Sequence, residues 1–431
     1  MLFGVVTSAL IGICLSFGDV YGEGVEVTRY DGYKVVRVEI NNQETLEKIQ
    51  HLSNNKRPKF DFWTYPIYPN QSAVISVSPQ SFGLLKRSLK QEGLQFEVTI
   101  HDLQDVIDKE STEANRQTRG MFDLNQYHRH SEINSWLSLL ASSPKCAGAC
   151  EMFSVGRSHE GRDMKGIKVG LPGSNKLSVW IDGGIHAREW ISPATVLNIL
   201  NYLIEDNYGG DADAKAILKR FDVYILPVVN PDGYDHSWTR NRLWRKNRQN
   251  GKGHYYGCEG VDLNRNWGHH WMEAGADSYP CSDIYAGSSA MSEPETQNVA
   301  NYILRRKNNM KIFLTFHSYG LYWLTPWGYT SKRPVDYQDL IAKANKATSK
   351  IRDYRGLRYK VGTSTNVLYA AAGGSDDWAK GVAGIKYSYT VELPDDGRHG
   401  FVLPAREIRP VGVETYAGVK ELFKAVLADY A

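Results

Sequence analysis

The chain has 431 residues, of which 42% are hydrophobic and 12% aromatic, so it is too long for one average domain and has ample material for a large core. We therefore expect two folded units. The formal net charge is only +3 and no block of like charges occurs, so nothing in the composition indicates a nucleic-acid-binding protein.

The first eighteen residues form one apolar stretch that ends in small residues and is too short and too early for a membrane span. This pattern predicts a secretory signal peptide over residues 1–18, with an N-terminal anchor as the alternative because no basic segment precedes it. Cleavage after Gly18 or Gly22 would suit the small-residue preference. No later segment is long and apolar enough to span a bilayer, so we expect a soluble, secreted protein without a membrane partner.

Residues 30–110 alternate between strand and helix patterns. The strands are expected over 34–40, 60–65, 72–78 and 94–100, and the helices over 44–52 and 81–91. The order β-α-β-β-α-β is that of a small ferredoxin-like α+β sandwich. One N-glycosylation sequon, Asn70-Gln-Ser, falls inside it.

Residues 102–119 are polar, helical in propensity and end in two isolated arginines, Arg116 and Arg119. The segment predicts an exposed connector that a trypsin-like protease could cut, with an ordinary linker helix as the alternative. We place the end of the N-terminal unit at Arg119.

Beyond residue 120 the pattern changes to buried-type strands that alternate with long amphipathic helices. The strands are expected over 164–170, 176–182, 221–229, 311–316 and 386–393, and the helices over 194–208, 295–307 and 416–430. This order predicts an α/β domain built around a largely buried sheet, over residues 120–431.

Four of the five cysteines remain once the signal peptide, with Cys14, is removed. An even number in an oxidising compartment predicts two disulfides. Local order favours Cys146 with Cys150 and Cys258 with Cys281, although four cysteines allow three pairings. A zinc site made of cysteines is the weaker alternative, because no C-x-x-C spacing occurs.

The sequence GGIHAREW places two potential metal ligands directly after a predicted strand. His186 and Glu189 follow the strand at 176–182, and His317 lies at the end of another apolar strand, KIFLTFHS. Open α/β sheets bind ligands beyond the carboxyl ends of their strands, where these side chains could converge. Two imidazoles and one carboxylate form a catalytic zinc set, although each residue taken alone could be structural.

Six motifs in chain order, HAREW, NPDGYDHSWTRNRLWRKNR, GVDLNRNW, TFHSYG, YAAAGGSDDW and YTVELPDDGRHGF, resemble those of the zinc carboxypeptidases of the pancreatic A and B type. The resemblance covers nearly all of residues 120–431, and the N-terminal sandwich is similar to the propeptide of these enzymes in size and pattern. It implies a mixed sheet flanked by helices, one zinc ion, peptide substrates with a free C-terminus and activation by a trypsin-like protease.

The resemblance also implies roles for individual residues. His186, Glu189 and His317 would bind the zinc ion, and Asp262 would accept the free N–H of His186. Glu392 would be the general base, and Arg245 would stabilise the developing oxyanion. The remaining matched positions are those that would hold the terminal carboxylate, Asn264, Arg265 and Tyr369, and the outer substrate contacts, Arg188, Ser318 and Tyr319.

The resemblance is to the B type at Asp376, where enzymes that accept Lys and Arg have aspartate and A-type enzymes have an apolar residue. Small residues at Gly328 and Ser364 would leave room for a long side chain. Alternatively, Asp376 could face solvent or cap a helix that begins near Trp378, and Asp377 could be the capping residue instead. Pro394 departs from the basic residue that the family usually has there. A-type specificity, a catalytically silent binding protein and a hormone-processing carboxypeptidase are the alternative functions.

Overall fold

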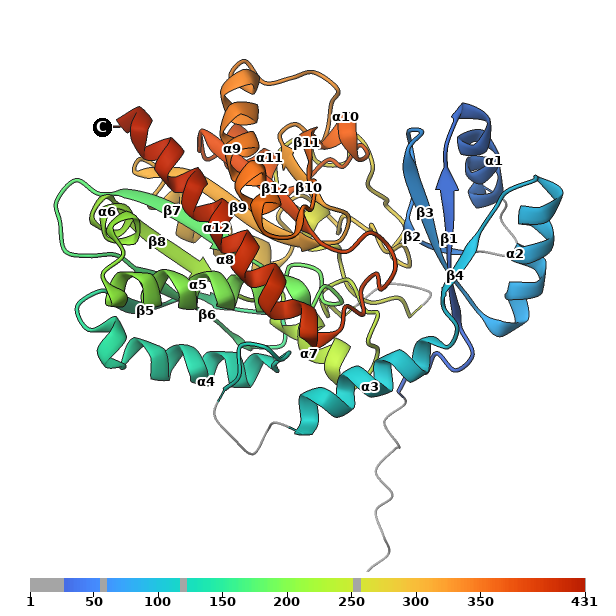
Figure 1. Cartoon of the computed structure of the whole chain (residues 1–431), viewed down its shortest axis with the longest axis horizontal. Helices are drawn as coiled ribbons and strands as arrows, with labels where there is room; N and C mark the ends of the chain where they lie inside the picture. Colours follow the sequence, from blue (N-terminus) through green and yellow to red (C-terminus); the bar gives the residue numbers. More distant parts are fainter. Residues whose placement is uncertain (1–26, 55–59, 117–121, 251–256, 431) are drawn as a thin grey trace, which may run out of the picture.

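The computed structural model describes residues 27–54, 60–116, 122–250 and 257–430. The predicted signal peptide and Arg119 lie outside the described residues. Figure 1 shows a smaller N-terminal unit, drawn in blue, that lies against one side of a larger C-terminal unit. We use "N-terminal unit" for residues 27–116 and "C-terminal unit" for residues 122–430.

The N-terminal unit has the β-α-β-β-α-β order that its sequence predicts. Its elements are β1 (Lys34–Ile40), α1 (Gln43–Asn54), β2 (Asp61–Thr64), β3 (Gln71–Val77), α2 (Pro79–Gln91) and β4 (Glu97–Ile100). The strands form an antiparallel sheet in the order β2-β3-β1-β4. The side chains of Val36, Val38 and Ile40 pack under α1 and α2, whereas Val35 points to the opposite face. That opposite face contacts the C-terminal unit through Leu243 and Phe401, so both faces of the sheet are covered.

The connecting helix α3 (Leu103–Arg116) differs from the exposed connector that its polar sequence predicts. Leu103, Ile107 and Glu110 lie on one face at helical spacing, and all three are buried. The Glu110 carboxylate accepts hydrogen bonds from Nε and Nη2 of Arg242 in the C-terminal unit. The helix is therefore exposed on one side only, because its other side packs against the C-terminal unit.

The C-terminal unit is built on a mixed eight-stranded sheet in the order β11-β10-β12-β9-β7-β8-β6-β5. The strands are β5 (Cys150–Arg157), β6 (Asp163–Val169), β7 (Leu177–Asp182), β8 (Phe221–Leu226), β9 (Met310–Ser318), β10 (Tyr322–Thr325), β11 (Lys360–Thr363) and β12 (Tyr387–Leu393). The helices are α4 (His130–Ala141), α5 (Ile191–Gly209), α6 (Ala212–Arg220), α7 (Pro231–Thr239), α8 (Pro294–Leu304), α9 (Tyr337–Arg355), α10 (Ser364–Val367), α11 (Ser375–Gly381) and α12 (Ile408–Leu427).

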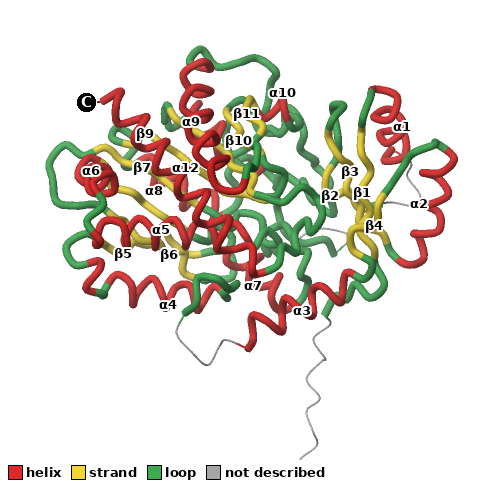
Figure 2. The backbone as a smooth tube through the Cα atoms, viewed as in Figure 1, coloured by secondary structure: helices red, strands yellow, loops and turns green. Residues whose placement is uncertain are grey.

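Helices cover both faces of this sheet, whose strands Figure 2 draws in yellow among the red helices. One face packs against α4, α5, α6, α9 and α12, and the other packs against α8 and α11. Successive residues of β7 alternate between the two cores, with Val179 and Ile181 on the first face and Trp180 on the second. This double burial is why the central strands read as continuous apolar runs rather than as alternating patterns.

The peripheral strands are the part of the sheet that the sequence did not predict. β10 and β11 have four residues each, and β5 at the other edge is only partly buried. Short or half-exposed strands carry little apolar signal.

Two disulfides join Cys146 to Cys150 and Cys258 to Cys281, as local order favoured. Among the described residues, no helix is both long and apolar enough to cross a membrane.

Candidate active site

The carboxyl ends of three adjacent strands bring the predicted site residues together. β12, β9 and β7 are neighbours and run parallel, with Glu392 on β12 directly beside His317 on β9. His186 and Glu189 lie in the loop that connects β7 to α5. Because parallel strands end at the same edge of a sheet, these four side chains meet at one place, although they come from distant parts of the sequence.

His186, Glu189 and His317 present three potential ligand atoms to one another. Nδ1 of His186 lies 2.8 Å from Oε1 of Glu189 and 3.1 Å from Nδ1 of His317, and the latter lies 3.2 Å from Oε2 of Glu189. All three residues are buried. Two imidazole nitrogens and a carboxylate that converge in this way fit a zinc ion, which prefers nitrogen and oxygen ligands of this kind.

Asp262 lies behind His186 and beside Arg245. Its Oδ1 is 3.1 Å from Nε2 of His186, the ring nitrogen on the side away from Glu189. Its Oδ2 accepts hydrogen bonds from Nε of Arg245 at 3.1 Å and Nη2 at 2.8 Å. Burial pushes the pKa of Asp262 upward, but the charges of Arg245, His186 and Arg265 together hold it well below its usual value. Asp262 is therefore ionised and orients both the imidazole and the guanidinium.

The Glu392 side chain is accessible from the cleft but is otherwise surrounded by protein. It is partly exposed in the cleft, at the register position opposite His317. Burial, which disfavours the charged form, raises the pKa of Glu392 to about 7. A carboxyl with a pKa near neutrality is suited to accept and then return a proton. The unusual Pro394 follows the last residue of β12, so the strand that carries Glu392 is regular through Leu393.

Several of the residues described above line a cavity of about 370 Å³. At one end of this cavity lie the residues that the family resemblance assigns to the substrate's terminal carboxylate. Arg265 is buried, and its Nε donates to the carbonyl of Gly275 at 2.8 Å. Asn264 accepts from the backbone N–H of Ser375, and Tyr369 lies on the facing loop. A side chain at Gly275, whose φ is +59°, would meet the carbonyl of Ala370, so only glycine lets these two loops approach.

Asp376 lies in this cavity together with Gly328 and Ser364. Its side chain is buried, and Oδ2 has no hydrogen-bond partner within the part of the chain that the structure describes. The neighbouring Asp377 is different, because its carboxylate accepts the backbone N–H groups of Gly328 and Tyr329. The alternative in which Asp376 faces solvent is therefore wrong, and Asp377 holds the loop at 328–329 rather than exposing its charge.

The N-terminal unit covers the other end of the cavity. Phe62, Trp63, Thr64 and Tyr65, on and next to β2, line it together with Arg188, Ser318 and Tyr319. Thr64 Oγ1 donates to Tyr319 Oη at 3.1 Å, and the Trp63 ring lies 5.3 Å from that of Phe401. The Arg188 guanidinium lies over the same Phe401 ring. Residues of the two units thus share one cavity.

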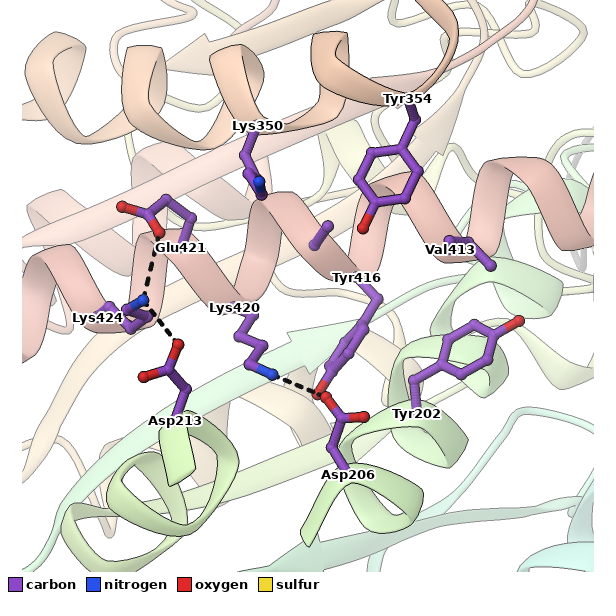
Figure 3. A pocket seen from close by; sticks show the side chains of 11 residues that line it. Tyr202, Asp206, Asp213, Lys350, Tyr354, Val413, Tyr416, Lys420, Glu421 and Lys424 are labelled. Atoms are coloured by element: carbon purple, nitrogen blue, oxygen red, sulfur yellow. Dashed lines mark hydrogen bonds and ion pairs between the residues drawn. The ribbon is translucent and has the colours of Figure 1, made fainter. Parts of the chain in front are cut away.

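Another hollow, of about 390 Å³, lies between α5, α6, α9 and α12 (Figure 3). Four of its charged groups pair with one another, Lys420 with Asp206 and Lys424 with Asp213. None of the site residues that the sequence predicts lines this hollow. Within the described ranges, His186, Glu189 and His317 are the one group of His, Cys, Asp or Glu side chains that could hold a metal ion.

Two charged contacts, one in the cleft and one behind its lining, were not predicted from the sequence. Asp283, at the rim, lies 3.4 Å from Nη1 of Arg188. The Glu110–Arg242 pair joins the connecting helix to the segment just before Arg245. The polar sequence of 102–119 predicted an exposed connector, because no local pattern indicates that a carboxylate such as Glu110 will be buried or which arginine it will meet.

Comparison with known proteins agrees with this geometry. Residues 133–418 match the family model of zinc carboxypeptidases, and residues 36–110 match that of carboxypeptidase activation peptides. The chain is 48% identical over 310 residues to carboxypeptidase B of Astacus astacus, covering 72% of this chain and 100% of that one. It is 37% identical over 415 residues to carboxypeptidase A2 of Mus musculus, covering 95% and 96%.

Among solved structures, the thrombin-activatable fibrinolysis inhibitor is similar to this chain with a TM-score of 0.83 and 32% identity, over 92% of this chain and 99% of that one. The family match spans the sheet that carries the metal-ligand set, and the activation-peptide match spans the unit that covers the cleft. The chain therefore belongs to the zinc carboxypeptidase family, as a zymogen that carries its own activation peptide.

Proposed function

We propose that the protein is a secreted zymogen of B-type specificity, which after activation removes Lys or Arg from the C-terminus of peptides and proteins. The observation that carries this proposal is the buried carboxylate of Asp376 in the cavity, one oxygen of which lacks a partner among the described residues. The proposed boundaries are a signal peptide over 1–18, an activation peptide over 19–119 and a catalytic domain over 120–431.

Zinc, when bound by His186, Glu189 and His317, supplies a Lewis acid that polarises the scissile carbonyl and makes a water molecule more acidic. In the proposed mechanism, Glu392 accepts a proton from the attacking water and later delivers it to the leaving amine. Arg245 meets the negative charge that develops on the carbonyl oxygen. The guanidinium is held by Asp262 before the reaction begins, so little reorganisation is needed in the transition state.

Restriction to free C-termini is assigned to the end of the cavity that Arg265, Asn264 and Tyr369 line. A guanidinium offers a planar fork of donors that suits a carboxylate. An internal peptide bond has no such charge, and the buried Arg265 would then remain without its ligand. Arg188, Ser318 and Tyr319 are assigned to the residues upstream of the scissile bond, on the side that the N-terminal unit covers.

The names of the relatives do not decide between A and B specificity, because both a carboxypeptidase B and a carboxypeptidase A2 are similar to the chain. Asp376 supports the B type, since a buried carboxylate is costly unless a cation meets it. The deciding experiment is a panel of peptides that differ only in the C-terminal residue, assayed before and after activation. A preference for Phe or Leu would support the A-type alternative, and no turnover at all would support a silent binding protein.

The specificity should depend on pH through Asp376. Burial raises the pKa of the Asp376 carboxyl above its usual value, so the group takes up its proton at a higher pH than an ordinary carboxyl does. As the pH falls through that raised pKa, the pocket loses its negative charge. The ratio of kcat/KM for C-terminal Arg to that for C-terminal Leu should therefore fall on acidification from about pH 8 to about pH 4.5.

In the Asp376→Asn variant the ratio should be low at every pH in this range. A wild-type ratio that does not change with pH would contradict an ionised Asp376 as the group that selects the substrate's cation.

Latency is assigned to the contacts between the two units. Three consecutive residues of the C-terminal unit bind the first and last parts of the N-terminal unit. The Arg240 carbonyl accepts a hydrogen bond from Thr28 N–H at 2.8 Å, and Asn241 Oδ1 accepts one from Tyr30 Oη–H at 2.7 Å. Arg242 donates to Glu110 on α3. The segment 240–242 thus holds the activation peptide where β2 covers the cavity.

Limited trypsin treatment should cut the chain at Arg116 or Arg119 and increase turnover, because the cut separates the covering unit from the catalytic domain. The measurement is N-terminal sequencing of the product together with the hydrolysis rate of a small peptide that ends in Arg. Full activity of the uncut protein on that peptide would show that the N-terminal unit does not block the cleft.

A further inference from the structure

One buried polar residue next to the site has no role in the mechanism above. Asn247 is fully buried and lies two residues after Arg245. Its amide has two hydrogens and two acceptor positions, and all four are used. Nδ2 donates to Glu293 Oε2 at 2.7 Å and Glu295 Oε2 at 3.1 Å, and Oδ1 accepts from Val261 N at 2.8 Å and Gln249 N at 3.3 Å.

The donor side of Asn247 meets two buried carboxyl groups at the start of α8. Glu293 also accepts from Ser292 Oγ, and Glu295 also accepts from the backbone N–H of His159 at 2.8 Å. Burial raises the pKa of both carboxyls, that of Glu295 to about 7. Each receives one hydrogen of the same amide. Loss of that amide would leave Glu295 with the donor from His159 and Glu293 with those from Ser292 and the Gln249 amide, so each buried acid would lose one hydrogen bond.

The acceptor side ties together the two segments that carry Arg245 and Asp262. The backbone N–H of Asn247 donates to the Val261 carbonyl at 3.0 Å, and its side chain accepts the Val261 N–H in return. The segments approach so closely at Gly260 that a side chain there would meet the Asn247 carbonyl at 2.4 Å. Arg245 and Asp262 are thereby placed opposite each other, at hydrogen-bonding distance.

We propose that Asn247 is a positioning residue: by joining Glu293 and Glu295 to Val261, it fixes the Arg245–Asp262 pair in the geometry used in the transition state. The inference rests on the oxyanion role proposed above for Arg245. A guanidinium that stabilises charge present only in the transition state contributes to kcat, so loosening it should lower kcat more than it raises KM.

The first test is a double-mutant cycle on the activated enzyme, with Asn247→Leu introduced into the wild type and into an Arg245→Ala background. In the wild type kcat should fall about 10- to 100-fold. In the Arg245→Ala background the same change should alter kcat by no more than about twofold, because the group that Asn247 positions is already absent. An equal loss in both backgrounds would overturn the proposal. Arg245→Ala alone tests the proposed function separately: an unchanged kcat there would refute the role of Arg245.

The second test reverses the direction of one hydrogen bond and does not require the leucine variant to fold. Asn247→Asp keeps the acceptor for Val261 N–H but turns a carboxylate oxygen toward Glu293 and Glu295, so kcat should fall. Adding Glu295→Gln supplies a donor to that oxygen, leaves an acceptor for His159 N–H and restores the original net charge. We expect the double variant to regain part of the lost kcat, because one of the two carboxylate contacts is relieved while Glu293 still faces the new carboxylate oxygen.

A folded double variant no more active than Asn247→Asp alone would overturn the proposal. The matched control is Asn198→Leu, which removes another buried amide, on α5, that donates to the carbonyls of Leu124 and Ala194. This control should lower the midpoint of thermal unfolding and leave kcat unchanged, which separates loss of stability from loss of positioning.

Discussion

Glu392→Gln should bind one zinc ion as the wild type does and lose nearly all turnover, with kcat lower by roughly 10²- to 10⁴-fold. The amide conserves the shape of the side chain on β12 beside His317 but cannot accept a proton from the attacking water. Glu392 is not among the three grouped metal-ligand residues, so metal content should not change. The measurements are zinc content per chain and kcat on a peptide that ends in Arg, both after activation.

Glu189→Gln is the informative companion, because it changes the same chemical group at a proposed ligand. It should lose zinc as well as activity, whereas Glu392→Gln should lose activity alone. A Glu392→Gln enzyme that holds one zinc ion with a kcat near that of the wild type would show that another group is the base.

Asp376→Ile should exchange the specificity of the activated enzyme. Replacing the buried carboxylate by an apolar side chain removes the partner of the substrate's cation and the cost of desolvating that carboxylate. The kcat/KM for C-terminal Arg and Lys should fall, by an amount that corresponds to a loss of about 2 to 5 kcal/mol of transition-state stabilisation. The kcat/KM for C-terminal Leu and Phe should rise. The panel of peptides that differ only in the C-terminal residue measures both changes.

Asp283→Asn is the matched control for this prediction. Asp283 is also a carboxylate of the cleft, but it is exposed at the rim and pairs with Arg188. A pair with one partner exposed to solvent in this way contributes little, and Asp283 lies at the rim rather than beside Asp376, so its removal should leave the ratio of Arg to Leu nearly unchanged. A wild-type preference for Phe over Arg would refute the B-type assignment even if the zinc mechanism holds.

The order of elements in the N-terminal unit and the central strands of the C-terminal unit could be predicted because these strands are buried on both faces. Apolar runs such as 176–182 and 386–393 mark these strands without any knowledge of their neighbours. The four-residue strands β10 and β11 could not be found in this way, since too few residues carry the pattern. The buried face of α3 was missed because a buried Glu110 reads as a solvent-exposed residue until its partner is known.

The sequence by itself determined the chemical types of the site and their positions at strand ends. His186, Glu189 and His317 could be expected near one edge, because open α/β sheets bind ligands at the carboxyl ends of their strands. That β7 and β9 are parallel neighbours, so that these residues meet, was decided by the topology of the sheet. Only the tertiary structure decided which of Asp376 and Asp377 turns its charge into the cavity, that Arg242 meets Glu110, and that Asn247 joins Glu293 and Glu295 to Val261. The physical reason is that periodicity reports whether a side chain is buried, whereas its partner depends on how distant segments pack.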